Sequence, residues 1–432
     1  MNKTTFIVGF TLFAIFFGAG NLIFPPRLGL ESGTNFWSAI FGFVLTGVGL
    51  PLIGIIVSAF YEGGYKNAIN RIHPWFSVVF LIAIYLSIGP FFAIPRTATT
   101  SYELAVLPFI HSPGQMSLFI FSVIYFLLSL WLALNPSKMV ERIGAVLTPM
   151  LLIAILALVT KATFLLMEQE SAVQISSVSN DKSAFFYGFV QGYLTMDTLA
   201  SLAYSVIILA AIQAKGIRHK TELIRQTVMA SIIAGVALML IYISLAWIGN
   251  KMILDPTLLA ESKQDIGTYI LNTITTQAFG NLGQILLGLI VTLACLTTTV
   301  GLIVSVSEYF NEIYHKISYK TYVVIFTFIG LCIANQGLNY IITKSIPILL
   351  VLYPISMTII LLLCINLFMT IPIIAQRISI GLVSLISIAS VSGMSFIEKL
   401  PLKEYSLEWL IFAVAGTIIG YILHLFKPAT GK

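Results

Sequence analysis

The feature that most constrains this chain is a succession of long apolar stretches that continues from one end to the other. A helix needs roughly 20 mostly apolar residues to cross the hydrocarbon core of a bilayer, and such stretches recur here with only short polar gaps. With 58% apolar and 9% charged residues, the chain has too little polar surface to cover a water-soluble globule. We therefore expect residues 1–432 to form a single all-α domain embedded in the lipid bilayer.

The polar gaps divide the chain into about twelve predicted transmembrane helices. An even number of crossings would place both termini on the same side of the membrane. The helices are expected near residues 5–29, 37–61, 75–107, 116–134, 142–166, 184–214, 224–249, 281–313, 319–336, 339–368, 373–394 and 407–426.

The distribution of charge predicts which side that is. Cytoplasmic loops of membrane proteins carry an excess of Lys and Arg. If both termini are cytoplasmic, the segments on their side hold most of the basic residues and the opposite loops hold most of the acidic ones. We therefore expect a multi-pass protein of the cell membrane with cytoplasmic termini. The basic residues concerned are Lys3, Lys66, Arg71, Lys138, Arg142, Lys215, Arg218, Lys220, Arg225, Lys316, Lys320, Arg377, Lys427 and Lys432, and the acidic ones are Glu168, Glu170, Asp181, Asp255, Glu261 and Asp265.

Several functional classes lack a site in this sequence. The formal charge of +6 is scattered over many gaps, so no basic stripe predicts a nucleic-acid partner. The five histidines lie at predicted helix ends or in loops, which leaves metal catalysis and Ser/His/Asp chemistry without an evident site. No GxxxxGK[ST] motif occurs, so we expect neither ATP-driven transport nor a required ATPase subunit. The sequence therefore predicts neither an enzyme nor a cofactor. The cysteines, which all fall in apolar runs, predict no disulfide: Cys295, Cys332 and Cys364.

The first predicted helix is interrupted about halfway, at Gly18-Ala19-Gly20-Asn21, and continues through Pro25-Pro26. This run lacks a small-residue cleavage site, so we interpret it as a transmembrane helix and not as a signal peptide. Gly and Pro weaken the helical ladder, and backbone groups freed at membrane depth must line a cavity or find protein partners. Close helix packing or a simple proline kink is an equally good interpretation of these residues alone.

The sixth predicted helix is also interrupted halfway, at residues 192–197, and here the break carries the carboxylate of Asp197. Inserting an acidic side chain at that depth of the bilayer costs a free energy on the order of 3 kcal/mol, so such a residue is rarely incidental. Breaks five helices apart match two five-helix repeats of inverted topology, and paired broken helices indicate a binding site near the bilayer midplane. We expect the repeats at 1–167 and 184–368, followed by two additional helices at 373–426.

Such a site has a direct chemical preference. The N-terminal end of a half-helix offers unpaired N–H groups to a carboxylate, and unwound carbonyls suit a small hard cation. A zwitterion with an apolar side chain fits that combination. The hydroxyl run Thr297-Thr298-Thr299 in the eighth helix could supply oxygen ligands to Na⁺ or Li⁺. Alternatively, each Thr bonds a carbonyl one turn earlier in its own helix.

Three longer motifs resemble those of the branched-chain amino acid transport system II carrier family. The resemblance extends over essentially the whole chain in length and number of helices. It implies cation-coupled uptake of leucine, isoleucine and valine on a LeuT-like fold, with Na⁺ as the expected coupling ion and Li⁺ or H⁺ as alternatives. The motifs are FFGAGNLIFPPRLG at 16–29, GPFFAIPRTATTSYE at 89–103 and QGYLTMDTLAS at 191–201.

The resemblance also implies roles for individual residues. Backbone N–H groups of the first break would hold the substrate carboxylate, while Asn21 would meet a cation as well. Thr195 would contact that cation, and Asp197 would lie close to the substrate. The residues expected at the substrate are Gly18, Ala19, Gly20, Asn21, Arg96, Gln191, Gly192, Tyr193, Thr195 and Asp197, and those expected at the cations are Ala14, Phe17, Asn21, Thr195, Ala294, Thr297 and Thr298.

Two residues depart from the LeuT-like pattern. Asp197 stands where relatives of the neurotransmitter type usually have a small hydroxyl residue, so it could bind the substrate amino group, bind the cation or carry a proton. Arg96 has no counterpart there. It could contact the substrate, or it could be a buried partner of Asp197 that holds the third and sixth helices together.

The sequence as a whole predicts a secondary active symporter that moves branched-chain amino acids inward. The alternative from another class is a channel or passive pore for small solutes. A channel would be expected to show repeated filter segments or rings of charge. This chain offers a few single buried charges instead.

Overall fold

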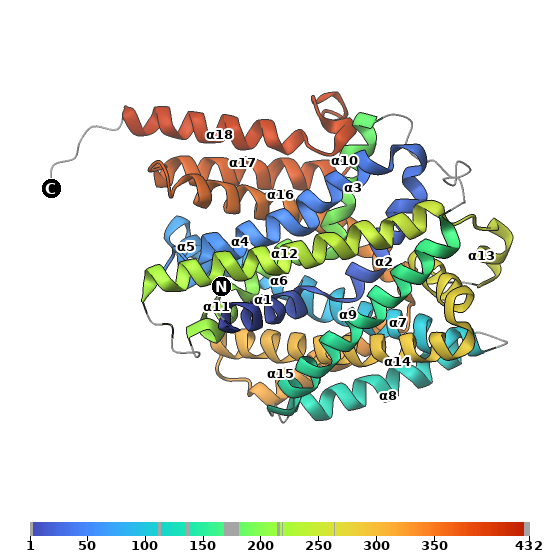
Figure 1. Ribbon diagram of the computed structural model, residues 1–432. Helices are drawn as coiled ribbons and strands as arrows, with labels where there is room; N and C mark the ends of the chain where they lie inside the picture. Colours follow the sequence, from blue (N-terminus) through green and yellow to red (C-terminus); the bar gives the residue numbers. More distant parts are fainter. Residues whose placement is uncertain are drawn as a thin grey trace.

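The computed structural model describes residues 3–110, 114–134, 138–167, 181–213, 217, 219–262 and 264–426, and this part of the chain contains helices and connecting segments but no strand. Figure 1 shows most of the long helices running side by side along one direction. The helices are α1 (Lys3–Phe16), α2 (Ala19–Ser32), α3 (Phe36–Val44), α4 (Leu50–Ser58), α5 (Gly64–Ile72), α6 (Pro74–Leu86), α7 (Ala93–Ala105), α8 (Gln115–Leu134), α9 (Lys138–Leu166), α10 (Asp181–Gln191), α11 (Asp197–Gln213), α12 (Lys220–Lys251), α13 (Pro256–Ser262), α14 (Ile266–Ile313), α15 (Tyr319–Ala334), α16 (Leu338–Ile365), α17 (Ile373–Val391) and α18 (Glu408–Leu425).

Helix length and composition confirm a polytopic membrane protein. Within the described ranges, nine helical stretches are long and apolar enough to cross a membrane, and two shorter apolar helices accompany them. One stretch, Ala19–Ser58, has 40 residues. It contains α2, which completes the first crossing begun by α1, and then α3 and α4, which form the second crossing. With the crossing formed by α10 and α11, these elements account for the predicted all-α architecture of about twelve spans.

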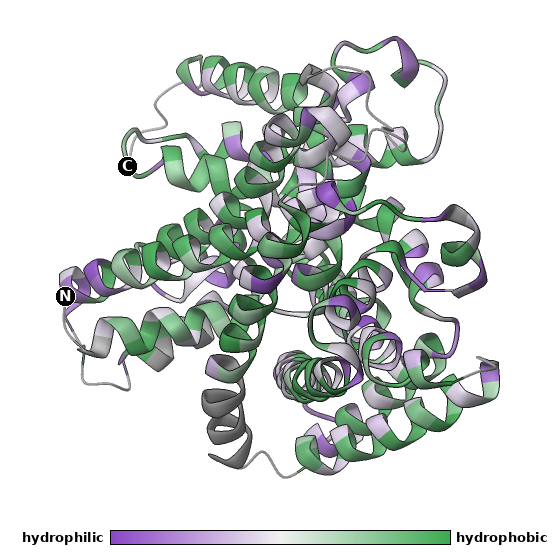
Figure 2. Cartoon of the chain, turned by 45° about the vertical axis from the view of Figure 1, so that its right-hand side comes forward, coloured by the Kyte–Doolittle hydropathy of each residue, from purple (hydrophilic) through white to green (hydrophobic). Residues whose placement is uncertain are grey.

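The exterior of the bundle is apolar, as lipid contact requires. Phe164 and Leu282 are 77% and 76% exposed and are two of many large hydrophobic side chains that point outward. Figure 2 shows hydrophobic residues along the helices and hydrophilic ones mainly at helix ends and in loops. Buried polar residues gather instead in the interior, where Asn21, Arg96 and Asp197 lie.

The first transmembrane helix breaks over a shorter stretch than predicted. Helix α1 ends at Phe16, and α2 resumes at Ala19, so only Phe17 and Gly18 lie outside the two helices. The expectation that Ala19-Gly20-Asn21 is unwound is therefore wrong. Pro25-Pro26 lies inside α2 and does not end it, because neighbouring helices can support a proline within a packed bundle.

The third transmembrane helix, predicted to be continuous over 75–107, is in fact broken. Helices α6 and α7 are separated by a π-helical turn (Ser87–Phe91), in which Gly89 has non-helical angles of φ −96° and ψ −124°. Gly89-Pro90 is a local signal for this break, but we interpreted it only as part of a family motif. A methyl group at residue 89 would lie 2.8 Å from the Val306 side chain, so this break packs closely against α14.

The eighth transmembrane helix begins where the sequence predicts, although a further helix precedes it without a gap. Within α14, Gly280 adopts φ 63° and ψ −161°, which kinks the chain just before the predicted start at residue 281. Residues 266–279 therefore form a separate helical arm. Polar residues such as Asn272 and Gln277 interrupt its apolar pattern, which is why it was not predicted as a helix.

Helices α17 and α18 form a pair at one edge of the bundle, at the top of Figure 1. Their contact is close, because a methyl group at Gly416 or Gly420 would lie 2.6 Å or 2.2 Å from the backbone of α17. These are the two additional C-terminal helices that the sequence predicts. The division of the preceding residues into two repeats stays a prediction.

Basic loops predicted to share one side do meet at one end of the bundle. The Lys66 ammonium, on α5, pairs with Glu312 at the end of α14, and Arg377 Nε donates to the Ile72 carbonyl at 2.5 Å. Figure 1 shows α5, the start of α1 and the end of α18 at this left-hand end. Which side faces the cytoplasm stays a prediction. The described residues do not include Glu168, Glu170, Lys215, Arg218, Lys427 and Lys432, nor the side chains of Lys3, Lys138, Arg142 and Asp181.

Candidate functional site

The two predicted breaks meet in the interior of the bundle. The second break consists of a 3-10 helix (Gly192–Thr195) and Met196 in the left-handed conformation, with φ 70°. Helix α11 then begins at Asp197, so its carboxylate lies in the first turn. On the facing element, Asn21 lies in the first turn of α2. Both breaks therefore present the beginning of a half-helix to the same region.

A buried group of three side chains joins these breaks to α12, and we call it the central triad: Asn21, Asp197 and Tyr242. Asn21 Nδ2 donates to Asp197 Oδ2 at 2.8 Å and also to the Tyr242 hydroxyl. The Tyr242 hydroxyl donates to the same Asp197 oxygen at 3.2 Å. All three residues are buried. The carboxylate is thus held by two hydrogen bonds from two different helices, as a buried charge requires.

Asn21 also fixes the geometry of the first break. Its Oδ1 accepts the Gly18 N–H at 3.2 Å, and its own N–H donates to the Gly18 carbonyl at 3.2 Å. This reciprocal pair caps the start of α2. The first N–H groups of that helix, at Ala19 and Gly20, have no intrahelical partner. A single side chain therefore connects the cap of α2 to the carboxylate of α11.

Arg96, on α7, holds the second break through its backbone. Its Nη1 donates to the Leu194 carbonyl at 2.6 Å, and its Nη2 donates to the Thr195 carbonyl at 3.1 Å. Arg96 does tie the third and sixth helices together, but the predicted partner was wrong: among the described residues no ion pair within 4.0 Å joins Arg96 to Asp197. The 3-10 and left-handed turns free these carbonyls from the helical ladder, and the guanidinium satisfies them.

Two of the predicted glycines are required by close approach. A methyl group at residue 20 would lie 2.7 Å from Arg96 Nη2, and one at residue 192 would lie 2.0 Å from Thr46 Oγ1. Gly18 differs, because the atom nearest to a methyl group there would be 3.8 Å away. The structure therefore explains Gly20 and Gly192 by packing, whereas Gly18 has room for a methyl group at ordinary van der Waals distance.

Tyr193 packs against α16 next to the second break. Its ring stacks on Tyr353 with 4.6 Å between the centroids, and its hydroxyl points toward Met357 Sδ at 3.7 Å. Gln191 and Tyr193 both line a small cavity of about 50 Å³ together with Leu349. Of the predicted substrate residues around 191–193, Tyr193 and Gly192 are buried beside the break and Gln191 is not.

The predicted cation ligands are not brought together in this structure. The hydroxyls of Thr297 and Thr298 donate to the Ala294 carbonyl at 2.8 Å and 3.1 Å. Thr195 Oγ1 likewise donates to a local carbonyl, that of Gly192, at 2.9 Å. These bonds are the local alternative that the sequence left open. Ala14 and Phe17 lie at the end of α1, which packs mainly on α12 and contacts α14 at most marginally.

Sequence reasoning missed two residues that build the region and considered a different role for a third. Tyr242 completes the central triad, and Tyr353 stacks on Tyr193. The third hydroxyl of the run, Thr299, contacts Thr97 Oγ1 at 2.5 Å and the Tyr125 hydroxyl at 2.8 Å, so it joins α14 to α7 and α8. The available signal was the position of these hydroxyl-bearing residues within apolar helices, which does not by itself identify a partner.

With this geometry established, comparison with known proteins defines the family. The family model described as "Branched-chain amino acid transport protein" matches residues 1–427. The chain belongs to this family. A Staphylococcus saprophyticus protein named as a branched-chain amino acid carrier is 52% identical over 98% of this chain and 97% of its own length. A Staphylococcus haemolyticus protein of the same name is 51% identical over 99% of this chain and 98% of its own length. The resemblance stated from the motifs is confirmed.

Solved structures confirm the LeuT-like fold of this chain. Mhp1 in an inward-facing conformation has a TM-score of 0.62 at 11% identity and covers 99% of this chain and 92% of that one. MhsT in complex with L-phenylalanine has a TM-score of 0.57 at 17% identity, and the match covers 96% of this chain and 98% of the MhsT chain. At such low identity the likeness concerns the fold alone. The family confirms a membrane transporter and not an enzyme, and no observation supports a channel.

Proposed function

We propose that this chain is a secondary active symporter that imports leucine, isoleucine and valine together with Na⁺ and needs no ATPase subunit. The observation that carries the proposal is the central triad, in which a buried carboxylate joins both broken helices. In a LeuT-like fold, half-helices that begin at such a point form the substrate site. Family membership supplies the substrate class.

The triad suits the polar part of an amino acid. The unpaired N–H groups at Ala19 and Gly20 and the positive end of the α2 dipole would receive the substrate carboxylate. Asp197 would accept the substrate ammonium group, because its carboxylate is already oriented by Asn21 and Tyr242. The stacked rings of Tyr193 and Tyr353 lie next to the second break and would contact a branched apolar side chain.

Coupling to Na⁺ would follow from a movement of α1. The carbonyls of Ala14 and Phe17 would meet Ala294, Thr297 and Thr298 only if the end of α1 approached α14. A cation that takes ligands from both helices would bind the closed arrangement more tightly than the open one. Coupling requires such a difference in affinity between the two conformations. Occupation of the site by Na⁺ and closure of α1 would therefore occur together.

Uptake by purified carrier in liposomes tests the proposal directly. Labelled leucine should accumulate under an inward Na⁺ gradient and should not accumulate when choline replaces Na⁺. Both conditions are measured at two pH values. Unlabelled isoleucine and valine should compete, whereas lysine should not. Equal uptake in choline at both pH values, or equilibration without accumulation, would contradict symport. Uptake that follows an inward pH gradient in choline would assign coupling to H⁺ instead.

We also propose that the protein lies in the cell membrane with both termini in the cytoplasm. The carrier has three cysteines, all in apolar helices, so these would first be replaced by serine. Single cysteines placed at Arg71 and at Asp255 should then react differently with a membrane-impermeant maleimide in intact cells. Labelling only at residue 255 is the expected result. Labelling at residue 71 in intact cells would contradict the orientation.

A further inference from the structure

A second pocket lies at the end of the bundle away from α5, between α7, α8 and the start of α16. Its volume is about 290 Å³, close to the roughly 300 Å³ at which small-molecule sites begin. The chain reaches this end because α6 starts beside α5 and α7 continues in the same crossing to Ala105. We call it the α7–α8–α16 pocket. Residues that line it include Tyr102, Glu103, Gln115, Leu118, Asn339 and Tyr340.

This pocket is separate from the central triad. Glu103 follows Arg96 by seven residues, which corresponds to about 10 Å along a helix. None of the lining residues belongs to the triad or to either break of the first and sixth helices. A ligand bound there would occupy a different place from a substrate held by Asp197.

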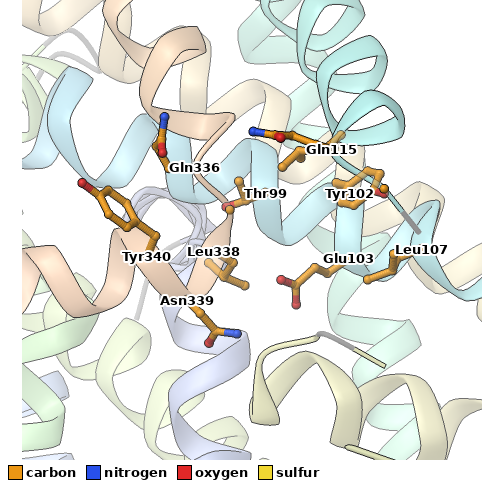
Figure 3. A pocket seen from close by; sticks show the side chains of 12 residues that line it. Thr99, Tyr102, Glu103, Leu107, Gln115, Gln336, Leu338, Asn339 and Tyr340 are labelled. Carbon is orange, nitrogen blue, oxygen red and sulfur yellow. The ribbon is translucent and has the colours of Figure 1, made fainter. Parts of the chain in front are cut away.

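The wall of the pocket includes a buried carboxylate, Glu103, that is only 5% exposed. Its Oε2 accepts the Asp265 N–H at 2.9 Å and also the Thr268 hydroxyl. In the described part of the chain, no Lys or Arg lies within 4.0 Å of this carboxylate. Figure 3 shows its oxygens directed toward the space near Leu338 and Asn339.

The groups behind Glu103 leave an excess of negative charge. Arg27 pairs with Glu31 at 3.0 Å and with Asp265 at 3.5 Å. Glu31 and Asp265 thus share one guanidinium, whereas Glu103, which accepts the Asp265 N–H, has no cationic partner among the described residues. A buried carboxylate is most stable with a cationic partner. The pocket beside Glu103 is the place from which a mobile cation could supply that partner.

The remaining lining identifies what kind of cation fits. Gln115, Asn339 and Tyr340 offer neutral hydrogen-bonding groups, and Leu118 and Leu338 offer apolar surface. The described residues contain no cluster of three His, Cys, Asp or Glu side chains that could hold a metal ion. An ammonium group attached to a small apolar body matches both the carboxylate and the leucine side chains.

We propose that the α7–α8–α16 pocket is a second binding site, which takes a small primary ammonium compound with the Glu103 carboxylate as its anchor. The ammonium group bonds Glu103, and the apolar part of the ligand lies against Leu118 and Leu338. Both a free amino acid and a simple amine carry this chemistry. Because Glu103 also holds α7 to the start of α14, a bound ligand stabilises this end of the bundle.

Binding measurements on the full carrier in nanodiscs test the site. The Asp197→Asn variant serves as the background, so that the central triad does not contribute. Three probes of similar size are compared by calorimetry: leucine, isopentylamine, which lacks the carboxylate, and isocaproate, which lacks the ammonium group. Isopentylamine should bind and isocaproate should not. Leucine binds as well if the site takes amino acids, and its failure beside bound isopentylamine would restrict the site to simple amines.

Two further variants in that background locate the binding. Glu103→Gln removes the anchor, and Leu118→Trp fills the pocket from α8 without touching the carboxylate. Each should weaken isopentylamine binding by about tenfold or more, as expected for loss of a charge-assisted hydrogen bond. Glu31→Gln changes a buried neighbouring charge but does not line the pocket, so it should weaken isopentylamine binding less than Glu103→Gln does.

Two results of these binding measurements would overturn the proposed site. Absence of isopentylamine binding in the Asp197→Asn background would overturn the proposal, as would binding that Leu118→Trp leaves unchanged. Leu118→Trp keeps the test valid if Glu103→Gln does not fold. Liposome uptake is measured on the unmodified carrier, so a failure of the symport proposal would be seen separately from a failure of this one.

Discussion

The two breaks that form the central region differ in how firmly they are held. The first consists of only Phe17 and Gly18, and its one side-chain contact to the backbone is the cap from Asn21. The second has a 3-10 helix and a left-handed residue, and its carbonyls are held by Arg96. Gly192 is enclosed by Thr46 and the Phe43 carbonyl, whereas a methyl group at Gly18 would meet its nearest neighbour at an ordinary 3.8 Å.

This difference assigns unequal roles to the two halves of the site. A break whose carbonyls are satisfied and whose glycine is enclosed resists rearrangement, because closely packed interiors do not deform gradually. A break of only two residues, whose glycine has room for a further methyl group, can change its angle at lower cost. We therefore expect α1 to move during transport, while the second break keeps its shape and orients Asp197.

The largest effect should come from the residue that joins the two breaks. Asp197→Asn preserves size but removes the charge that Asn21 and Tyr242 hold, so leucine uptake should fall by about a hundredfold or more. Uptake in liposomes measures this, and thermal unfolding of the purified variant checks that insertion and folding are intact. Normal uptake would remove Asp197 from the site.

Arg96→Met should damage the second break. It leaves the Leu194 and Thr195 carbonyls buried without a donor, at about 1–3 kcal/mol each. The melting temperature should therefore fall markedly, and uptake should fall with it. Arg225→Met is the matched control, because Arg225 is 77% exposed on its side chain and its loss should change stability by less than about 0.5 kcal/mol. Equal melting temperatures for the two variants would show that Arg96 does not hold the break.

A pair of alanine substitutions compares the breaks themselves. In Gly192→Ala the new methyl group would lie 2.0 Å from Thr46 Oγ1, and such overpacking costs about 1–3 kcal/mol. Gly18→Ala meets nothing closer than 3.8 Å and should leave unfolding unchanged. Thermal unfolding in detergent measures both, and the reverse order would mean that the first break is the rigid one. Loss of uptake in a stable Gly18→Ala protein would show that the substrate contacts Gly18.

The smallest expected effect concerns the cation. Thr298→Ala should raise the half-saturating Na⁺ concentration by up to about tenfold, and that of leucine by less, if its hydroxyl leaves Ala294 to bind Na⁺ when α1 closes. Thr299→Ala is the control, since its hydroxyl contacts Thr97 and Tyr125 and should affect stability more than Na⁺ dependence. An unchanged Na⁺ dependence in Thr298→Ala would leave that hydroxyl with a packing role only.

Much of the fold follows from the sequence because lipid imposes a local rule. Each crossing must be a helix with an apolar exterior, so the span positions, the breaks near Gly18 and Gly192 and the final pair of helices could be predicted from short windows of residues. The break at Gly89 was missed because a single Gly-Pro pair is also compatible with a continuous kinked helix. The start of the eighth transmembrane helix was predicted correctly because Gly280, where the chain kinks, is itself a local signal for a helix boundary.

The partners within the site depended on the tertiary structure. Asn21 meets Asp197 across 176 residues and Tyr242 across 221, and no local pattern carries such pairings. Sequence alone identified Asp197 and Arg96 as important, because a buried charge in lipid is costly wherever it lies. It could not show that Arg96 binds two carbonyls instead of Asp197, since that depends on how the second break turns its backbone. The sequence thus determined where the helices and charges lie along the chain, and the packing of distant helices decided which groups those charges contact.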